Sequence, residues 1–267
     1  MQAKKHFGQN FITDKNLINK IVSCLDEDSD LVIEIGPGKG ALTGVLVDRF
    51  KKVIAIEIDK DLEPLLREKF DTPNFELIIG DVLEKDFKSL IDFSKYKKVQ
   101  IISNIPYYIT SPIMFKIFNT SDVFSKAVFM VQKEVAQRIC ANVGEKPYNN
   151  LSITSQFYSK PKYEFTVGKQ MFKPIPKVDS AIITLDFSNN HVGEIVDHEK
   201  FIAFVRQVFN NRRKTILNNL SQTIGDKAKS ETILNSLNIK LTHRPENLTL
   251  EELMSVYIEI KKKKIDN

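Results

Sequence analysis

The sequence has no tryptophan and only two cysteines, Cys24 and Cys140. Two cysteines cannot form a disulfide framework, and no group of Cys and His residues has the spacing of a metal site. No apolar run approaches the roughly 18 residues that a membrane-spanning helix needs. Residues 1–6 lack the apolar core of an export signal. These absences predict a metal-free, cytoplasmic protein with no membrane contact.

The charge of the chain is modest but unevenly distributed. The net charge is +5 over 267 residues, of which 42% are hydrophobic and 27% charged, as in ordinary globular proteins. Residues 126–177 carry nine Lys or Arg against three Glu, and residues 205–267 carry twelve against seven acidic residues. Residues 30–125 carry thirteen against fifteen. Two basic segments beside a near-neutral one suit a polyanionic partner, although we interpret the Lys261–Lys264 run as a solvated tail.

Short apolar runs alternate with amphipathic segments in the first part of the chain. The predicted strands are residues 30–35, 52–57, 75–79, 99–103 and 127–131. This alternation predicts an α/β fold, in which a parallel sheet has helices on both faces. Residues 151–157 and 181–187 are two further strand candidates for an antiparallel edge. A helix start is predicted after the tetrapeptide, where Thr110-Ser111-Pro112 places a capping hydroxyl before proline at the first turn.

The pattern changes near residue 188, where a polar, linker-like stretch begins. Beyond it the apolar residues recur at helical spacing, and no strand candidate is found. Thr249 and Glu252 have the spacing of a capping box ahead of a final helix. The sequence therefore predicts two domains, an α/β domain over residues 1–187 and a small all-α domain over residues 188–267.

Polar residues and glycines stand at the ends of successive predicted strands. Gly36, Gly38 and Gly40 follow the first strand, where glycine permits a tight turn and lets a ligand approach the backbone. Glu57, Asp81 and Asn104 follow the next three strands. Ligands of open α/β sheets bind outside the carboxyl ends of the strands, so these residues predict one shared crevice. There Glu57 would accept hydrogen bonds from ribose hydroxyls, and Asp81 from an adenine amino group.

Several common active sites do not fit these residues. The glycine spacing is G-x-G-x-G, which differs from the dinucleotide fingerprint, and Lys39 is followed by Gly40, which excludes a P-loop. The four histidines lie outside the crevice-forming segments, which argues against hydrolysis by a Ser-His-Asp triad. Cys140 lies well past the fourth strand end, so covalent attack by a cysteine is not expected.

The tetrapeptide Asn104-Ile105-Pro106-Tyr107 can hold a flat ring that carries an amino group. Asn104 offers a side-chain carbonyl, and the backbone carbonyls of Ile105 and Pro106 are further acceptors. Tyr107 offers a face on which a base can stack. An isolated tetrapeptide of this kind would more often be a strand-to-loop turn that ends at proline. Its place at the fourth strand end favours a site for a nucleobase.

Taken together, the motifs resemble the KsgA/RsmA family of ribosomal RNA adenine dimethyltransferases. The similar segments are residues 7–12 (FGQNFI), 34–40 (EIGPGKG), Glu57, Gly80-Asp81, Asn104–Tyr107, 172–180 (FKPIPKVDS) and 211–215 (NRRKT). They occur in order over nearly the whole chain. The related Erm-type enzymes share only some of them. One mild departure is Ile105, where the family often has Leu.

The resemblance implies a Rossmann-like domain that binds S-adenosylmethionine and methylates two adjacent adenosines of 16S rRNA, each twice at N6, in the immature small ribosomal subunit. Its implied cofactor-binding residues are Asn10, Ile12, Gly36, Glu57, Asp81 and Asn104. Its implied catalytic residues are Asn104 and Pro106, which hold the amino group, Tyr107, which stacks on the base, and Phe172, which closes the other face. Candidate RNA contacts are Arg212, Arg213 and Lys214, unless they form a solvated helix face. We expect a monomer.

Two other functions remain open at this stage. An Erm-like enzyme would methylate adenine in 23S rRNA. A mainly non-catalytic small-subunit assembly factor would bind RNA through its basic segments, with a marked dependence on salt.

Overall fold

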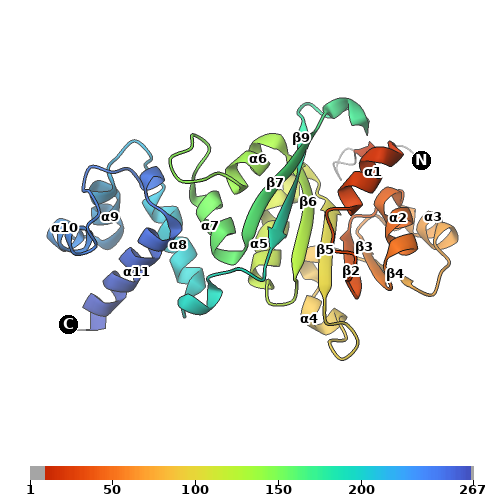
Figure 1. The fold of residues 1–267 in the computed structure, drawn as a ribbon, viewed down its shortest axis with the longest axis horizontal. Coiled ribbons are helices and arrows are strands. Elements are labelled where there is room, and N and C mark those ends of the chain that lie inside the picture. The colour runs from red at the N-terminus through yellow and green to blue at the C-terminus, as the bar shows by residue number, and fades with distance from the viewer. Residues whose placement is uncertain (1–9, 266–267) are drawn as a thin grey trace. The chain divides into compact units, whose positions relative to one another are not determined.

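The computed structural model describes residues 10–265 and divides into two compact units (Figure 1). The first unit comprises the chain up to Ala136 together with Pro161–Ser188, and the second comprises Gln137–Lys160 and the chain from Asn189 onward. The division after Ser188 lies next to the boundary expected from the sequence. Residues 137–160, however, group with the helical unit and not with the sheet.

The first unit is built on a seven-stranded sheet with the strand order β4-β3-β2-β5-β6-β9-β7. The strands are β2 (Leu31–Ile35), β3 (Val53–Glu57), β4 (Phe75–Ile79), β5 (Val99–Asn104), β6 (Lys126–Gln132), β7 (Lys160–Val167) and β9 (Ser180–Asp186). The first five are mutually parallel, and β9 pairs antiparallel with β6. The five parallel strands and β9 agree with the predicted strands to within one or two residues. Strands β3 and β4 are added on one side of β2, whereas β5 and β6 are added on its other side, so the strand order switches between β2 and β5. An open α/β sheet binds its ligand at such a switch point.

The central strands are continuous apolar runs because both of their faces are buried. All five residues of β2 and of β3 are buried. The helices of this unit are α1 (Lys15–Val22), α2 (Ala41–Arg49), α3 (Glu63–Lys69), α4 (Phe87–Leu90) and α5 (Thr110–Asn119), and α6 (Lys133–Ile139) follows β6. The main core cluster joins α1 and α2 to the sheet through residues such as Val22, Leu46 and Ile102. This architecture is Rossmann-like, as predicted.

The strand predicted at residues 151–157 is wrong, because this segment is the helix α7 (Asn150–Tyr158). Its alternation of apolar and hydroxyl residues is typical of a strand, but Ser152 and Thr154 are buried and donate to the carbonyls of Arg138 in α6 and Asn150 in α7. A capping box at Asn149 starts the helix. Side-chain hydrogen bonds to the local backbone therefore override the two-residue period.

The helix start predicted after the tetrapeptide is confirmed, because α5 begins at Thr110, but no hydroxyl caps it. The 3₁₀ turn Tyr107–Ile109 leads directly into α5, and the residue before the helix, Ile109, makes no capping bond with its side chain. The Thr110 hydroxyl instead donates to the Tyr107 carbonyl at 3.2 Å. The hydroxyl thus stabilises the turn that carries the tetrapeptide.

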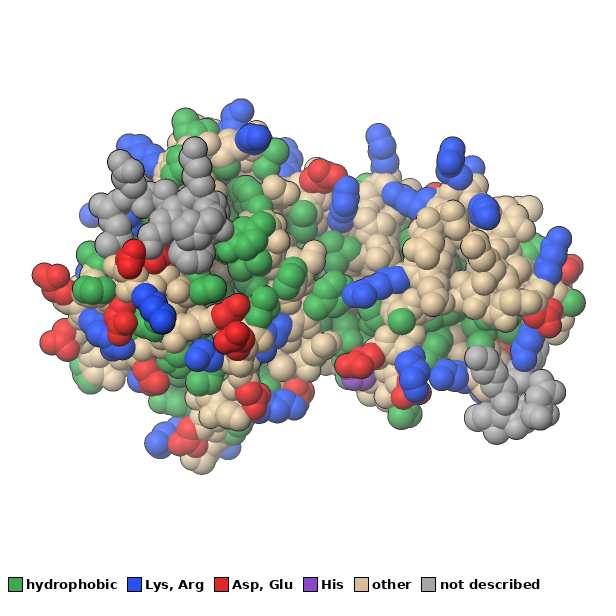
Figure 2. All heavy atoms as spheres, turned by 180° about the vertical axis from the view of Figure 1, so that it is seen from behind, with side chains coloured by type: hydrophobic (Ala, Val, Ile, Leu, Met, Phe, Trp, Pro, Cys, Tyr) green, Lys and Arg blue, Asp and Glu red, His purple; other side chains and the backbone are tan. Residues whose placement is uncertain are grey.

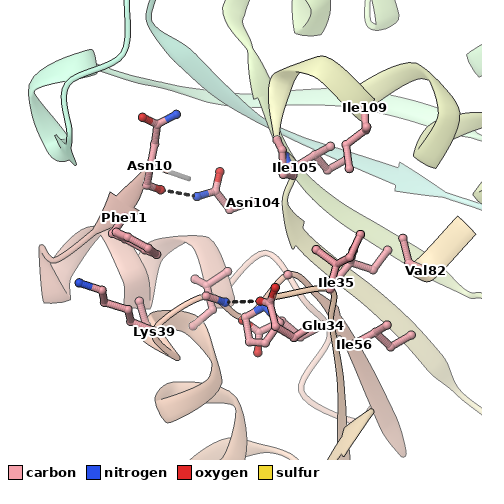
Figure 3. A pocket seen from close by; sticks show the side chains of 18 of the residues that line it. Asn10, Phe11, Glu34, Ile35, Lys39, Ile56, Val82, Asn104, Ile105 and Ile109 are labelled. Carbon is pink, nitrogen blue, oxygen red and sulfur yellow. Dashed lines mark hydrogen bonds between the residues drawn. The ribbon is translucent and has the colours of Figure 1, made fainter. Parts of the chain in front are cut away.

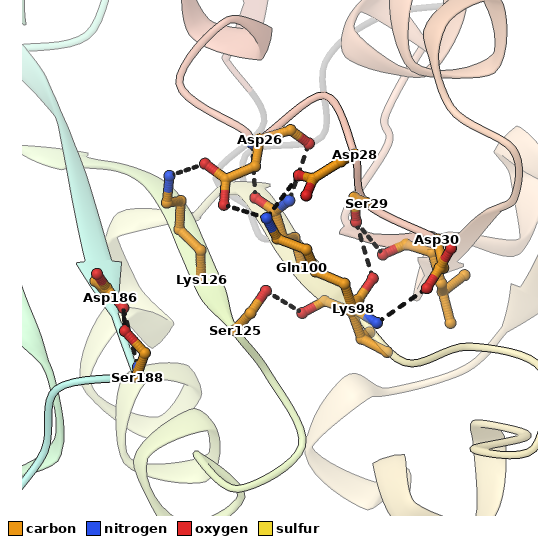
Figure 4. Close-up of polar contacts among 12 residues, drawn as sticks. Asp26, Asp28, Ser29, Asp30, Lys98, Gln100, Ser125, Lys126, Asp186 and Ser188 are labelled. Atoms are coloured by element: carbon orange, nitrogen blue, oxygen red, sulfur yellow. Dashed lines mark hydrogen bonds and ion pairs between the residues drawn. The ribbon is translucent and has the colours of Figure 1, made fainter.

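A polar network closes the amino edge of the sheet, opposite the crevice (Figure 4). Asp26 forms ion pairs with Lys98 and Lys126, and the Gln100 carboxamide exchanges two hydrogen bonds of 3.0 Å with the Asp26 backbone. Asp30 accepts from the backbone amides of residues 97 and 98. Burial acts to raise the pKa of Asp26, but the two lysines lower it overall. These bonds fix the loops that enter β2, β5 and β6.

A second, two-stranded sheet pairs β1 (Phe11–Ile12) with β8 (Phe172–Lys173) in antiparallel fashion. Phe11 lies opposite Lys173, and Ile12 lies opposite Phe172. This pairing holds an N-terminal segment beside the loop that precedes β9.

The second unit contains helices only, within the part of the chain that is described. They are α7, α8 (His198–Val208), α9 (Ile216–Ile224), α10 (Lys227–Ser236) and α11 (Leu250–Ile265). Phe201 packs its ring 5.1 Å from Phe157 and 5.5 Å from Tyr257, so α8 joins α7 to α11. The predicted capping box is confirmed, since Thr249 and Glu252 each accept from the backbone amide of the other. No helix among residues 10–265 is long and apolar enough to cross a membrane.

Candidate active site

A cavity lies at the carboxyl edge of the parallel strands, beyond the ends of β2 and β5 (Figure 3). Six of its lining residues are those predicted from the sequence to contact a cofactor, and they come from five segments of the chain. They are Asn10, Ile12, Gly36, Glu57, Asp81 and Asn104. The strand register explains why they meet. Ile35 pairs with Ser103, and Glu57 pairs with Ile79, so the residues that follow these strands lie level at one edge.

The glycine loop leaves space for a ligand where it borders the cavity. Gly36 has a φ of +67°, and a Cβ atom added there would meet no atom within 4 Å. Gly38 has a φ of +57° and lies against the Phe11 ring, on which the Lys39 ammonium group also rests at 4.6 Å. The loop can therefore present backbone amides to a ligand, while Phe11 packs on its other residues.

Gly40 differs from Gly36, because its missing side chain lets the Phe70 ring pack against the backbone. Its φ is +76°, and an added Cβ would lie 2.3 Å from the ring of Phe70. Gly40→Ala is expected to lower the free energy of unfolding by about 2–4 kcal/mol through backbone strain and overpacking. Gly44→Ala is the matched control, since its Cβ would lie 3.8 Å from the same ring inside α2. In urea denaturation, the midpoint of the control should equal or exceed that of the parent. Equal midpoints for Gly40→Ala and Gly44→Ala would contradict the argument.

Glu57 and Asp81 are carboxylates fixed by backbone amides. The two Glu57 carboxylate oxygens accept from the amides of Gly38, at 3.0 Å, and Asp59, at 2.8 Å. Glu57 is only 4% exposed, and burial raises its pKa above the usual range. The Asp81 carboxylate accepts from the Leu83 amide at 2.9 Å. Each carboxylate oxygen has a second lone pair, so both side chains remain able to accept from a ligand.

Glu34 lines the same cavity from within β2 and is almost fully buried. Its carboxylate accepts from the Thr43 hydroxyl at 2.6 Å. Burial is the main cause that raises its pKa from 4.5 to about 7, and the nearby Glu57 adds to the effect. At neutral pH this group therefore lies near the midpoint of its titration.

Glu34→Gln is expected to stabilise the protein more at pH 8 than at pH 5. Between these two pKa values the folded protein holds a proton on Glu34 that the unfolded chain has released. The contribution of this proton to the free energy of unfolding is full below pH 4.5 and is lost as the pH rises through about 7. Gln carries no charge and keeps an acceptor for Thr43. A shift from 4.5 to about 7 corresponds to a gain of about 3 kcal/mol at most. Melting temperatures of variant and parent across this pH range test it, and a difference that does not vary with pH would contradict it.

Asn104 is held in a defined orientation by the N-terminal segment. Its side-chain amide nitrogen donates to the Asn10 carbonyl at 3.1 Å (Figure 3). A carbonyl can only accept, so the NH₂ group must face Asn10, and the side-chain oxygen points the other way. The contact therefore leaves the oxygen of Asn104 as an acceptor on the side away from Asn10.

The second predicted acceptor, the Pro106 carbonyl, is already engaged. It accepts from the Ile109 amide at 3.1 Å, because the 3₁₀ turn starts there. The ladder between β5 and β6 ends at the pair of Asn104 with Met130. The Ile105 carbonyl, which lies between these two hydrogen-bonding patterns, is the other acceptor expected beside Asn104. The bond from Ile109 uses one lone pair of the Pro106 oxygen, and the catalytic role of Pro106 stays a prediction.

Two tyrosines border the cavity after the turn begins. Tyr107 is half-buried, and its hydroxyl forms a hydrogen bond of 2.7 Å with Ser180, which fixes the ring. Tyr108, to which the sequence analysis assigned no role, is 57% exposed and also lines the cavity. Ile58 is a second residue that the sequence analysis missed, being 43% exposed at the end of β3. A large apolar residue directly after Glu57 was the signal that could have found it.

Phe172 does not line the cavity, which corrects its predicted role. It is 1% exposed and belongs to the core cluster together with Ile12 and Met130. Its ring therefore cannot stack on a base in this structure. It supports β1, the strand that brings Asn10 and Ile12 to the cavity, and Ile12 itself is 5% exposed.

The predicted RNA-contacting residues lie in the second unit, in the turn between α8 and α9 and not on a helix face. Arg212 donates to the carbonyls of Lys146 and Tyr148, at 3.3 and 3.0 Å, so its guanidinium group anchors the preceding loop. Arg213 and Lys214 are exposed. On the face seen in Figure 2, Lys and Arg side chains outnumber acidic ones over the second unit, whereas both signs mix over the first.

Comparison with known proteins decides the family. A family model described as ribosomal RNA adenine dimethylase matches residues 1–262. This chain belongs to that family. It is 58% identical over 258 residues to the ribosomal RNA small subunit methyltransferase A of Mycoplasma capricolum, with 96% of this chain and 97% of the relative covered.

Solved structures give the same result for the fold. A dimethyladenosine transferase from Plasmodium falciparum is 28% identical, has a TM-score of 0.80, and is matched over 95% of this chain and 98% of its own. The 23S rRNA methyltransferase ErmE is 25% identical, with a TM-score of 0.74 and coverage of 94% and 100%. The Rossmann-like dimethylase fold and its helical unit are therefore shared over nearly the whole chain.

Proposed function

We propose that this protein transfers methyl groups from S-adenosylmethionine to N6 of two adjacent adenosines near the 3′ end of 16S rRNA, dimethylating each in the immature small ribosomal subunit. The observation that carries the proposal is the orientation of Asn104. Its side-chain nitrogen is held by the Asn10 carbonyl, which leaves its oxygen as an acceptor in the cavity that Gly36, Glu57 and Asp81 also line. The 58% identity to a small subunit methyltransferase supports the choice of rRNA.

The cavity fits the proposed cofactor. Gly36 leaves open space where its backbone borders the cavity, and apolar side chains such as Ile58 and Val82 offer surface to a nucleoside. Glu57 would accept hydrogen bonds from ribose hydroxyls, and Asp81 from the adenine amino group. The cofactor supplies an electrophilic methyl group on a sulfonium.

The residues of the chain contribute position and polarity. The target adenosine leaves its stack, at a cost of about a few kcal/mol, and its base rests against Tyr107. The Asn104 oxygen and the Ile105 carbonyl accept from its amino group, which turns the nitrogen lone pair towards the methyl donor. Bound S-adenosylmethionine would supply the methyl group, with a C–N bond formed in place of the C–S bond, and the alkylated nitrogen would release its proton to water. Positioning and fixed dipoles account for the rate, and no catalytic base is required.

The helical unit is proposed to bind the rRNA. Arg213 and Lys214 are exposed in the turn that Arg212 anchors, and lysine and arginine bind phosphates with a strong dependence on salt. We further propose that the protein is a monomer and acts in the cytoplasm, where small subunits mature.

Methyl incorporation tests the proposal. Purified protein, labelled S-adenosylmethionine and immature small subunits should yield dimethyladenosine at two adjacent positions, detected by mass spectrometry of the digested rRNA. Large-subunit rRNA is tested as the second RNA, because the fold is shared with ErmE. Methylation of large-subunit rRNA instead would establish the Erm-like alternative. If neither RNA is methylated while small subunits are bound, the protein is an assembly factor.

A further inference from the structure

The segment from Lys173 to Asp179, here called the rim loop, is attached to the active site at both ends. Lys173 pairs with Phe11, which lines the cavity. Ser180, which follows the loop, forms the 2.7 Å hydrogen bond with Tyr107. The rim loop therefore borders the cavity. In Figure 1 the segment that joins β7 to β9 projects beyond the sheet.

The rim loop is held at its base and exposed at its tip. The Asp179 carboxylate accepts from the Lys169 amide, and its carbonyl accepts from the Lys133 amide, both at 3.0 Å. Pro174 and Pro176 on either side of Ile175 each fix one backbone angle. Ile175 is nonetheless 66% exposed. The loop thus presents an aliphatic side chain to solvent on a stiff backbone.

The distribution of exposed apolar side chains singles out this region. Among the described residues of the first unit, the large hydrophobic side chains that are exposed are Ile58, Phe93, Tyr108, Ile175 and Val178. Two of them line the cavity and two belong to the rim loop. Only Phe93 lies elsewhere, in the loop before β5 at the amino edge. Exposed apolar side chains gathered at one place mark a binding surface.

The charges beside these side chains indicate which partner they contact. Lys173 and Lys177 are exposed and alternate with Ile175 and Val178, and the one acidic residue, Asp179, is turned to the Lys169 amide. Cations that alternate with aliphatic side chains suit a nucleic acid strand, since lysines neutralise phosphates and an aliphatic wedge can enter a base step.

We propose that Ile175 packs against the nucleotide next to the target adenosine and fills the gap left when that adenosine is extruded, while Lys173 and Lys177 contact the flanking phosphates. This inference rests on the proposed function. It assigns to the rim loop the contact that fills the gap left by the extruded adenosine.

Ile175→Ser tests the wedge. We expect it to lower kcat/KM for immature small subunits by about 10- to 100-fold, as lost burial of an aliphatic side chain would, and to leave the Kd of S-adenosylmethionine unchanged. Phe93→Ser removes an exposed apolar side chain from the opposite edge and should leave both values unchanged. A parent protein that methylates no rRNA would refute the proposed function. If the parent is active and Ile175→Ser is equally active, the proposed contact of Ile175 is refuted and the proposed function is not.

Crosslinking identifies the contact directly. A photoreactive amino acid placed at position 175 of the full chain should crosslink to rRNA within about two nucleotides of the methylated adenosines, and the same group at position 93 should not. Omission of S-adenosylmethionine keeps the substrate unmodified during the reaction. Crosslinks from position 175 to a ribosomal protein, or to rRNA far from the modified site, would overturn the proposal.

Discussion

Asn104→Ala is expected to lower the single-turnover rate of methyl transfer by about 10³-fold, as does the loss of a preorganised polar group at a reacting centre. The variant loses an acceptor for the adenine amino group. It also loses the 3.1 Å bond that ties β5 to the N-terminal segment at Asn10. The rate is measured with labelled S-adenosylmethionine, and a loss of less than about tenfold would contradict the role.

Asn104→Asp separates the two contributions of this residue. Asp keeps a carboxylate oxygen as an acceptor, but it has no N–H to donate to the Asn10 carbonyl. Two facing acceptors repel, so the carboxylate should turn and the rate should again fall. Binding of rRNA to Asn104→Ala is the control for the fold. If this variant also supports subunit assembly fully, catalysis is dispensable for that role.

Glu57→Ala should weaken binding of S-adenosylmethionine by about 100-fold, which equals about 2.7 kcal/mol. The variant removes the acceptor proposed for the ribose hydroxyls. It also leaves the amides of Gly38 and Asp59 without the carboxylate to which they donate at 3.0 and 2.8 Å. An unsatisfied buried donor costs about 1–3 kcal/mol, so the glycine loop should lose its fixed shape. Isothermal titration calorimetry measures the Kd.

Glu68→Ala is the matched control, because it removes an exposed carboxylate from α3, the helix that connects β3 to β4. Its Kd should equal that of the parent. Glu57→Gln is a further comparison, since Gln can accept from only one of the two amides. A Glu57→Ala variant that binds the cofactor as tightly as Glu68→Ala would show that the carboxylate has no part in the site.

Helix or strand in each segment was predictable wherever periodicity and burial agree. The five parallel strands were found because strands buried on both faces are short, continuous apolar runs. The segment 151–157 was misassigned because its period of two came from serines and threonines that bond to the helix backbone and not to a sheet. This helix lies within residues 137–160, which group with the helical unit.

The sequence alone determined which residues meet in the cavity, because parallel strands must end at one edge and the polar residues follow those ends. It also identified the family, through motifs that lie in order along the chain. Only the tertiary structure decided what each residue contacts there. The Pro106 carbonyl accepts from the 3₁₀ turn, Phe172 is buried in the strand that pairs with β1, and the Asn10 carbonyl holds the amide nitrogen of Asn104. These outcomes depend on hydrogen bonds and burial between segments as far apart as residues 10 and 104, and no local pattern contains them.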